Sequence, residues 1–260
     1  MSTLKFDDKA AENLVKAYST PDVKAQRAAV MDLLALTPGA HVIDVGSGPG
    51  FLCEAMAEKV GPQGRVLGVD ISTDLLALSR QRNPPPQLTY AEENALALSA
   101  ADGSFDVAVS TQVAEYIPDT AALLGEMFRV LKPGGRALVL ATDWNCVGWY
   151  SEDPERMDRV LRAWEGHAAY PSLPRTLAHD MTSAGFAVPQ IHAHPIINQT
   201  FERNRYSYGV AKIVRSYIEA NTPEGAPDPT DWFNELQSLA DAGRYYFSTA
   251  RMIFIAEKPA

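Results

Sequence analysis

The chain has 260 residues, a net charge of −9 at neutral pH and two cysteines, Cys53 and Cys146. This length suits one large α/β domain, and the acidic balance argues against nucleic acid or an anionic membrane as partner, because both usually meet a basic patch. Two cysteines outside any metal-ligand spacing predict neither a disulfide framework nor a bound metal. Without a leader pattern or a run as long as a membrane span, we expect a cytoplasmic protein.

Helix and strand signals alternate along the first half of the chain. Two amphipathic helices are predicted over residues 10–18 and 23–36, before the first strand. Later helices are predicted over residues 51–60, 120–131, 154–164 and 175–184. Another helix follows the strand 65–70 and runs through Arg82, and two more lie within residues 200–244. The predicted strands cover residues 41–45, 65–70, 88–90, 105–110, 136–141, 187–197 and 246–258. Strands separated by helices indicate an α/β fold with a doubly wound, mostly parallel, Rossmann-like sheet of seven strands.

The most informative stretch is His41-Val-Ile-Asp-Val-Gly-Ser-Gly-Pro-Gly50, in which a β-branched run leads into three alternate glycines. Such a run is typical of a buried parallel strand, and glycines let the backbone approach a ligand closely. A dinucleotide fingerprint needs its third glycine where Phe51 stands, and a phosphate-binding loop needs a lysine that this turn lacks. With Asp44 just before it, the turn favours a ligand that brings a cationic amino group to the helix N-terminus.

Four segments together resemble the class I S-adenosylmethionine-dependent methyltransferases, especially the small-molecule branch with the ubiquinone and menaquinone C-methyltransferases. Val-Ile-Asp-Val-Gly-Ser-Gly-Pro-Gly matches the first motif of that family, with Ser47 where many members have cysteine, and Val-Leu-Gly-Val-Asp-Ile-Ser72 matches the second. Asp102-Gly-Ser-Phe-Asp106 and Phe128-Arg-Val-Leu-Lys-Pro-Gly-Gly135 are also familiar from it. The resemblance covers residues 38–141 strongly and implies S-adenosylmethionine as the cofactor.

The resemblance implies a role for each matched cofactor residue. Gly46 and Gly48 would lie against the methionine part of the cofactor, Asp44 would orient its ammonium, and Asp70 would accept both ribose hydroxyls. The remaining implied contacts are Ile71 and the Asn94-Ala95 pair near adenine, Thr111 and Gln112 near the sulfonium, and Tyr18 as a cover from the N-terminal helices. Asn94 stands where the family often has aspartate and can still accept through its amide oxygen.

Some of these residues have a purely structural alternative. Asp70 competes with Ser72 for the role of helix N-cap, and Asn94 fits an Asx-turn as well as a ligand contact. The aromatic group in the second half suits an insertion core as well as a substrate box; it comprises Trp144, Trp149, Tyr150, Trp164 and Tyr170. His192 and His194 lack further ligands in reach and are interpreted as non-metal.

The reaction implied is an in-line displacement, in which an O, N or C nucleophile attacks the sulfonium methyl group. Alignment of the two reactants supplies much of the acceleration, and a general base is optional. Candidate bases are Asp143, Glu115 and His167, with Asp143 first by position, since the carboxyl ends of the strands line the ligand crevice. A turn cap is an equal alternative for Asp143.

We expect one methyltransferase domain over residues 1–260, with an N-terminal helical cap (1–37) and a cofactor-binding core (38–141). Insertions over 145–170 and 199–244, the second of them a helical lid before the last strand, would cover a small aromatic or heterocyclic acceptor. The alternatives are a catalytically silent S-adenosylmethionine-binding partner subunit and a nucleotide-dependent oxidoreductase. Monomer and homodimer both stay open.

Overall fold

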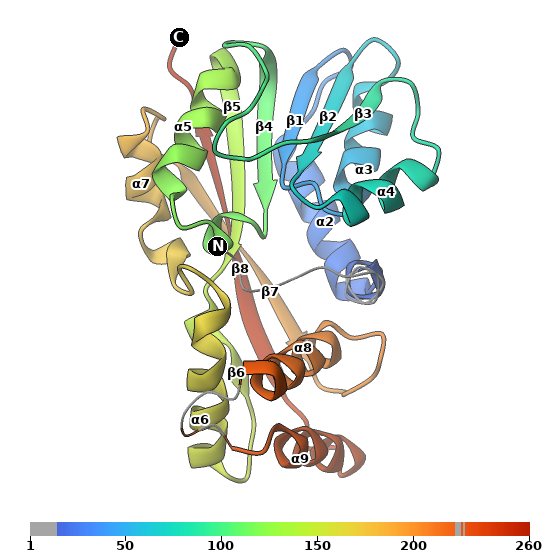
Figure 1. The fold of residues 1–260 in the computed structure, drawn as a ribbon, viewed down its shortest axis with the longest axis vertical. Helices are drawn as coiled ribbons and strands as arrows, with labels where there is room; N and C mark the ends of the chain where they lie inside the picture. Colours follow the sequence, from blue (N-terminus) through green and yellow to red (C-terminus); the bar gives the residue numbers. More distant parts are fainter. Residues whose placement is uncertain (1–14, 222–224, 226) are drawn as a thin grey trace.

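The centre of the molecule is a mixed β-sheet, drawn in Figure 1. The computed structural model describes residues 15–221, 225 and 227–260. The strands within these ranges are β1 (His41–Val45), β2 (Arg65–Asp70), β3 (Leu88–Glu92), β4 (Phe105–Thr111), β5 (Leu131–Thr142), β6 (Gly148–Trp149), β7 (Gln190–Asn198) and β8 (Phe247–Glu257).

Strand order in the sheet is β3-β2-β1-β4-β5-β8-β6, and β7 pairs with β8 off this path. The first five strands run parallel to their neighbours, whereas β8 is antiparallel to β5, β6 and β7. All seven predicted strands are present, and the two-residue β6 is an addition. The predicted α/β class with a mostly parallel sheet is therefore confirmed.

Helices begin where the sequence offers a capping residue. Thr20, Ser72, Asp119, Asp153 and Asp228 each accept a backbone N–H at a helix start. The α-helices are α2 (Pro21–Leu34), α3 (Phe51–Val60), α4 (Thr73–Gln81), α5 (Thr120–Val130), α6 (Pro154–Trp164), α7 (Leu177–Ser183), α8 (Tyr206–Asn221) and α9 (Pro229–Asp241). Short 3₁₀ turns are η1 (Ala114–Tyr116), η2 (Trp144–Cys146), η3 (Glu165–His167) and η4 (Leu173–Arg175).

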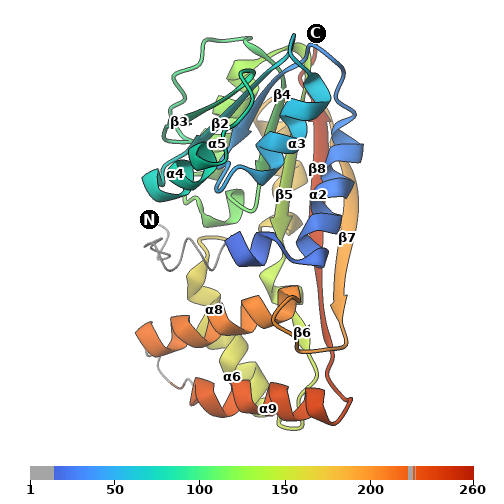
Figure 2. The same ribbon diagram turned by 90° about the vertical axis from the view of Figure 1, so that its right-hand side faces the viewer.

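Helices cover both faces of the parallel part of the sheet (Figure 2). On one face, α2 and α3 bury Val30, Leu34 and Met56 against β1, β4 and β5. On the other face, α5 and α7 bury Leu123, Met127 and other apolar residues. This doubly wound arrangement leaves the carboxyl ends of the parallel strands at one edge, where ligands bind in such folds.

A separate apolar cluster lies beyond that edge, in the lower half of Figure 1. It joins α6, α8 and α9 to β6, and Trp232 and Phe247 are fully buried in it. The long strands β7 and β8 run from the sheet into this cluster. Along the chain as described, no helix is both long and apolar enough to cross a membrane.

A few boundaries differ from the predicted ones. Of the predicted helix 10–18, residues 10–14 lie outside the described residues and 15–18 are helical. α2 ends at Leu34, because Ala35 adopts a left-handed φ of 43°. β5 starts five residues before the predicted strand, since Leu131 pairs with Phe105 across a bulge.

Candidate active site

The glycine turn between β1 and α3 is held against β2. Gly46 N–H and Ser47 N–H both donate to the Val69 carbonyl oxygen, at 2.8 and 2.9 Å. Gly46, Gly48 and Gly50 have φ values of 81°, 52° and 79°, in the left-handed region that favours glycine. The turn therefore has a fixed conformation that only this glycine spacing adopts without strain.

The space around the three glycines differs. A Cβ atom at Gly46 would stand 2.2 Å from Val113 Cγ2, and one at Gly50 would stand 2.3 Å from the Tyr90 hydroxyl oxygen. At Gly48 no described heavy atom lies within 4 Å of the same position. Gly46 and Gly50 are thus required by protein neighbours, while the space at the Cβ position of Gly48 is empty.

Asp70 joins this turn to the end of β2. Its Oδ2 accepts from Gly48 N–H and its Oδ1 from Ser72 N–H, both at 2.8 Å. Burial raises the pKa of Asp70, and these backbone hydrogen bonds oppose the rise. The N-cap of α4 is Ser72, whose side chain accepts from Leu75 N–H. Since a carboxylate offers about four acceptor positions, Asp70 still has capacity for two hydroxyl groups.

Asp44 is a buried carboxylate on β1, with 1% of its surface exposed. Its Oδ2 accepts from Cys53 Sγ at 3.2 Å, and its Oδ1 has no partner among the described residues. Burial raises the pKa of Asp44 to about 7; the Cys53 hydrogen bond opposes this rise and the charge of Asp70 adds to it. A cation placed at Oδ1 would satisfy this oxygen.

A small pocket opens between the glycine turn and α2. Its volume is about 30 Å³, room for only a few water molecules, so α2 packs closely on the turn. The predicted residues that line it are Tyr18, Asp44, Gly46, Ser47 and Thr111, and the others are Val23, Gln26, Arg27, Val30, Phe51 and Leu52. Sequence reasoning missed these other residues as site residues; for Gln26 and Arg27 the only local signal was an amphipathic helix.

A polar group lies at the carboxyl ends of β4 and β5. Gln112, with a left-handed φ of 59°, places its Nε2 2.8 Å from Thr142 Oγ1 and 3.2 Å from Glu115 Oε1. Glu115 Oε1 also accepts from Thr142 N–H at 3.2 Å, whereas Oε2 has no partner in the described ranges. Burial raises the pKa of Glu115 to about 7. A strained glutamine beside a buried carboxylate is typical of a functional site.

Asp143 is engaged by protein groups. Arg175 donates to both of its oxygens, at 2.7 and 3.3 Å, and Asn145 N–H donates at 3.2 Å as Asp143 caps η2. This geometry favours the capping alternative over a general base.

His167 is buried in an aromatic group. Its Nδ1 lies 2.6 Å from the Trp164 carbonyl oxygen, and its ring stacks on the Trp164 ring at 3.6 Å. Trp144, Tyr116 and Tyr217 surround it edge-on. Burial lowers the pKa of His167 to about 4, so the imidazole is neutral near pH 7 and a weak base.

The residues predicted near adenine lie outside the pocket. The Ile71 side chain is 74% exposed, just after β2. Asn94 Oδ1 accepts from Leu96 N–H at 3.0 Å, which is the Asx-turn alternative, and Ala95 is half-buried beside it. Their contacts with a cofactor stay predictions.

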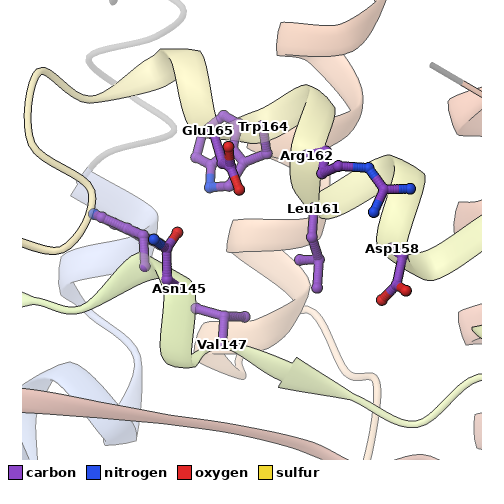
Figure 3. A pocket seen from close by; sticks show the side chains of 8 residues that line it. Asn145, Val147, Asp158, Leu161, Arg162, Trp164 and Glu165 are labelled. Carbon is purple, nitrogen blue, oxygen red and sulfur yellow. The ribbon is translucent and has the colours of Figure 1, made fainter. Parts of the chain in front are cut away.

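A second, larger pocket of about 260 Å³ lies between α6 and η2, shown in Figure 3. Asp158, Leu161, Arg162 and Glu165 come from the α6 side, and Trp144, Asn145 and Val147 from the η2 side. It shares no lining residue with the pocket at the glycine turn. Trp144 and Trp164 line it and also contact His167, so the aromatic group separates this pocket from Tyr116.

The strand order and the mostly parallel sheet match the Rossmann-like fold of solved methyltransferase structures. Residues 43–139 match the family model described as "Methyltransferase domain". This match supports the resemblance to the class I S-adenosylmethionine-dependent methyltransferases that the sequence motifs carry.

Known proteins similar to the chain differ in their acceptors. A demethylmenaquinone methyltransferase of Bacillus cereus is 36% identical over 46% of this chain and 52% of its own length. An arsenite methyltransferase of Aquipseudomonas alcaligenes is 41% identical over 39% of this chain and 32% of its own. The chain thus spans about half, or less, of the length of these relatives. The structure of Haemonchus contortus phosphoethanolamine N-methyltransferase 2 matches with a TM-score of 0.65 at 20% identity, over 100% of this chain and 59% of that one.

Proposed function

We propose that the protein transfers a methyl group from S-adenosylmethionine to an O, N or C nucleophile of a small aromatic or heterocyclic metabolite. The observation that carries this proposal is the buried Asp44 Oδ1, which has no partner among the described residues and belongs to the strand that leads into the glycine turn. An ammonium group would satisfy Asp44, and the empty space at the Cβ position of Gly48 would receive the rest of an amino-acid moiety. The domain match and the relatives' names support the same cofactor.

Each part of the cofactor has candidate residues. Asp44, Gly46, Ser47 and Gly48 would hold the methionine part, and Asp70 the ribose hydroxyls. The adenine would contact Ile71, Asn94 and Ala95. The sulfonium would contact Thr111 and Gln112. Tyr18 would close the site from the N-terminal side, where its ring stacks on Phe51 at a centroid distance of 6.5 Å.

A bound S-adenosylmethionine supplies an electrophilic methyl group on a cationic sulfur. The protein's part is to align the acceptor with that methyl group and to exclude water, which removes much of the entropic barrier. Where the nucleophile carries a proton, Glu115 is the best-placed base among the three candidates, because its Oε2 is unpartnered and its pKa lies near 7. Asp143 is held by Arg175, and His167 is too weakly basic.

Covering segments would enclose the acceptor. We propose that the N-terminal cap (1–37) and the insertions 145–170 and 199–244 form this cover, since α2, α6 and α8 lie around the carboxyl edge of the sheet (Figures 1 and 2). A cytoplasmic location and a monomeric or homodimeric state stay predictions.

Calorimetry tests the cofactor assignment. The protein should bind S-adenosylmethionine but not a nicotinamide cofactor, and Asp70→Ala should weaken that binding at least tenfold, because charge-assisted hydrogen bonds to the ribose are lost. Gly48 and Ser72 also depend on Asp70, so the melting temperature of the variant is measured alongside. Unchanged affinity would return Asp70 to a purely structural role. Methyl transfer from labelled S-adenosylmethionine to a metabolite panel then distinguishes an enzyme from a silent binding subunit.

A further inference from the structure

Arg251 is a buried cation that contacts α2 and α8, which belong to two of the segments proposed to cover the acceptor. Arg251 on β8 has only 4% of its surface exposed and pairs with Thr142 at the carboxyl end of β5. Its Nη1 donates to the Gln26 side-chain oxygen on α2, and its guanidinium lies 4.6 Å from the centre of the Tyr206 ring on α8. Three elements distant in sequence thus meet around this side chain.

Arg251 has no ion pair within the part of the chain that the structure describes. No Asp or Glu oxygen of the described chain lies within ion-pair distance of it, and its buried Nε donates to no described group. Burying an arginine without a carboxylate costs several kcal/mol in general, and a neutral amide and a tyrosine ring offset only part of that. Thr249, two residues earlier on the same face of β8, also has a buried hydroxyl without a partner.

Arg251 acts on the groups of the proposed active site. Burial raises the pKa values of Tyr18 and Glu115, to about 12 and about 7, and the charge of Arg251 opposes both shifts. The same charge acts on Tyr116, whose pKa is also raised by burial. Its charge therefore acts on Tyr18, which lines the pocket at the glycine turn, and on two residues of η1.

We propose that Arg251 binds a carboxylate group of the methyl acceptor, with Thr249 as a second donor. This assignment rests on the proposed function and narrows its substrate class to aromatic or heterocyclic acids. A planar carboxylate pairs side-on with the Nε and Nη atoms of arginine, and Nε is the atom left without a partner.

The surroundings favour a single negative charge over a phosphate dianion. Asp44 and Glu115 both lie close enough for their charges to act on Tyr18, as does that of Arg251. A dianion would meet these acidic groups with one guanidinium as counter-ion. A monoanionic carboxylate balances Arg251 one to one.

The test compares aromatic acids with their uncharged primary amides, which have nearly the same shape. We suggest 4-hydroxybenzoate, 4-hydroxycinnamate and indole-3-acetate, each paired with its amide, titrated by calorimetry at pH 8 with S-adenosylhomocysteine present. In at least one pair the wild type should bind the acid at least tenfold more tightly than the amide. Arg251→Met, which keeps the side-chain length without the charge, should abolish that preference while binding S-adenosylhomocysteine as before.

Arg136→Met is the matched control, because Arg136 lies on β5 at the opposite end of the sheet and donates to the Leu34 carbonyl oxygen. It should keep the full preference. If Arg251→Met does not fold, Arg251→Lys decides, since lysine keeps the charge but lacks the planar fork; the preference should fall at least threefold. The proposal is overturned if no pair shows a preference for the acid, or if the Arg251 variant retains it fully. Failure of the wild type to bind S-adenosylhomocysteine refutes instead the proposed function.

Discussion

Asp44 gives the proposed cofactor site a pH dependence that can be worked out in advance. Its pKa of about 7 means that roughly one tenth of the buried carboxyl groups are ionised at pH 6 and roughly nine tenths at pH 8. Only the ionised form pairs with an ammonium group. The affinity for S-adenosylhomocysteine, whose ammonium stays charged in this range, should therefore rise about tenfold between pH 6 and pH 8, equivalent to about 1.4 kcal/mol.

Asp44→Asn should remove this rise, because an amide does not titrate. At pH 8 the variant should bind at least tenfold more weakly than the wild type, and at pH 6 the two should be nearly equal. Isothermal calorimetry at pH 6, 7 and 8 measures all three points. Glu115→Gln is the control, since Glu115 also has a pKa near 7 but touches no proposed cofactor atom. It should keep the wild-type slope.

The free energy of unfolding gives an independent measure of the raised pKa of Asp44. Folding raises the pKa of this residue from its ordinary value of 3.8 to about 7. Between about pH 4 and pH 7, the folded protein therefore holds a proton that the unfolded chain has released. The contribution of Asp44 to the free energy of unfolding therefore falls as the pH rises through this window. Asp44→Asn should remove that fall in urea titrations at pH 5 and pH 8. The reasoning is refuted if the affinity of the wild type for S-adenosylhomocysteine does not change with pH. It is also refuted if the affinity of Asp44→Asn still rises between pH 6 and pH 8.

Three further predictions concern other residues of the site. If Glu115 is the base, turnover of the wild type should rise with pH through about pH 7. Glu115→Gln should lower turnover about 100-fold and abolish this rise, while cofactor affinity stays unchanged. A flat pH–rate profile in the wild type would contradict a role of Glu115 as base. Gly46→Ala should lower the free energy of unfolding by about 1–3 kcal/mol more than Gly48→Ala, because a Cβ atom at position 46 would stand 2.2 Å from Val113 Cγ2, whereas one at position 48 would meet no described atom. Equal losses in urea would show that left-handed strain alone matters. Asp143→Asn should keep turnover within about twofold of wild type, and a loss of 100-fold would restore Asp143 as the base.

The parallel part of the fold could be predicted because its signals are local. The residues of α3 and β2 match their predicted bounds, since glycines and β-branched runs mark both ends. The start of β5 could not be predicted: Lys132-Pro-Gly-Gly135 has the composition of a turn, yet Leu131 already pairs with β4 across the bulge. Pairing with a neighbouring strand overrides local preference there.

In the candidate site, too, residues of a local motif could be predicted and residues brought together by packing could not. Asp44, Gly46 and Ser47 could be proposed as site residues because one continuous motif contains them, and they line one pocket with Tyr18 and Thr111. Gln26 and Arg251 escaped prediction, although they are hydrogen-bonded, because 225 positions separate them in sequence. No spacing rule brings such residues together, and only packing of α2 against the sheet does. The ion pair of Asp143 could not be predicted for a similar reason, since Arg175 follows it by 32 positions.

The position of β8 between β5 and β7 affects the order in which the strands can pair during synthesis of the chain. β8 is synthesised after every other strand of the sheet, and within the described residues β6 and β7 pair with no strand except β8. A growing chain can thus complete its parallel strands early, whereas β6 and β7 wait for residues 247–257. We expect limited proteolysis of stalled or shortened chains to leave the glycine-turn half resistant and to cut the half that carries α6, α8 and α9.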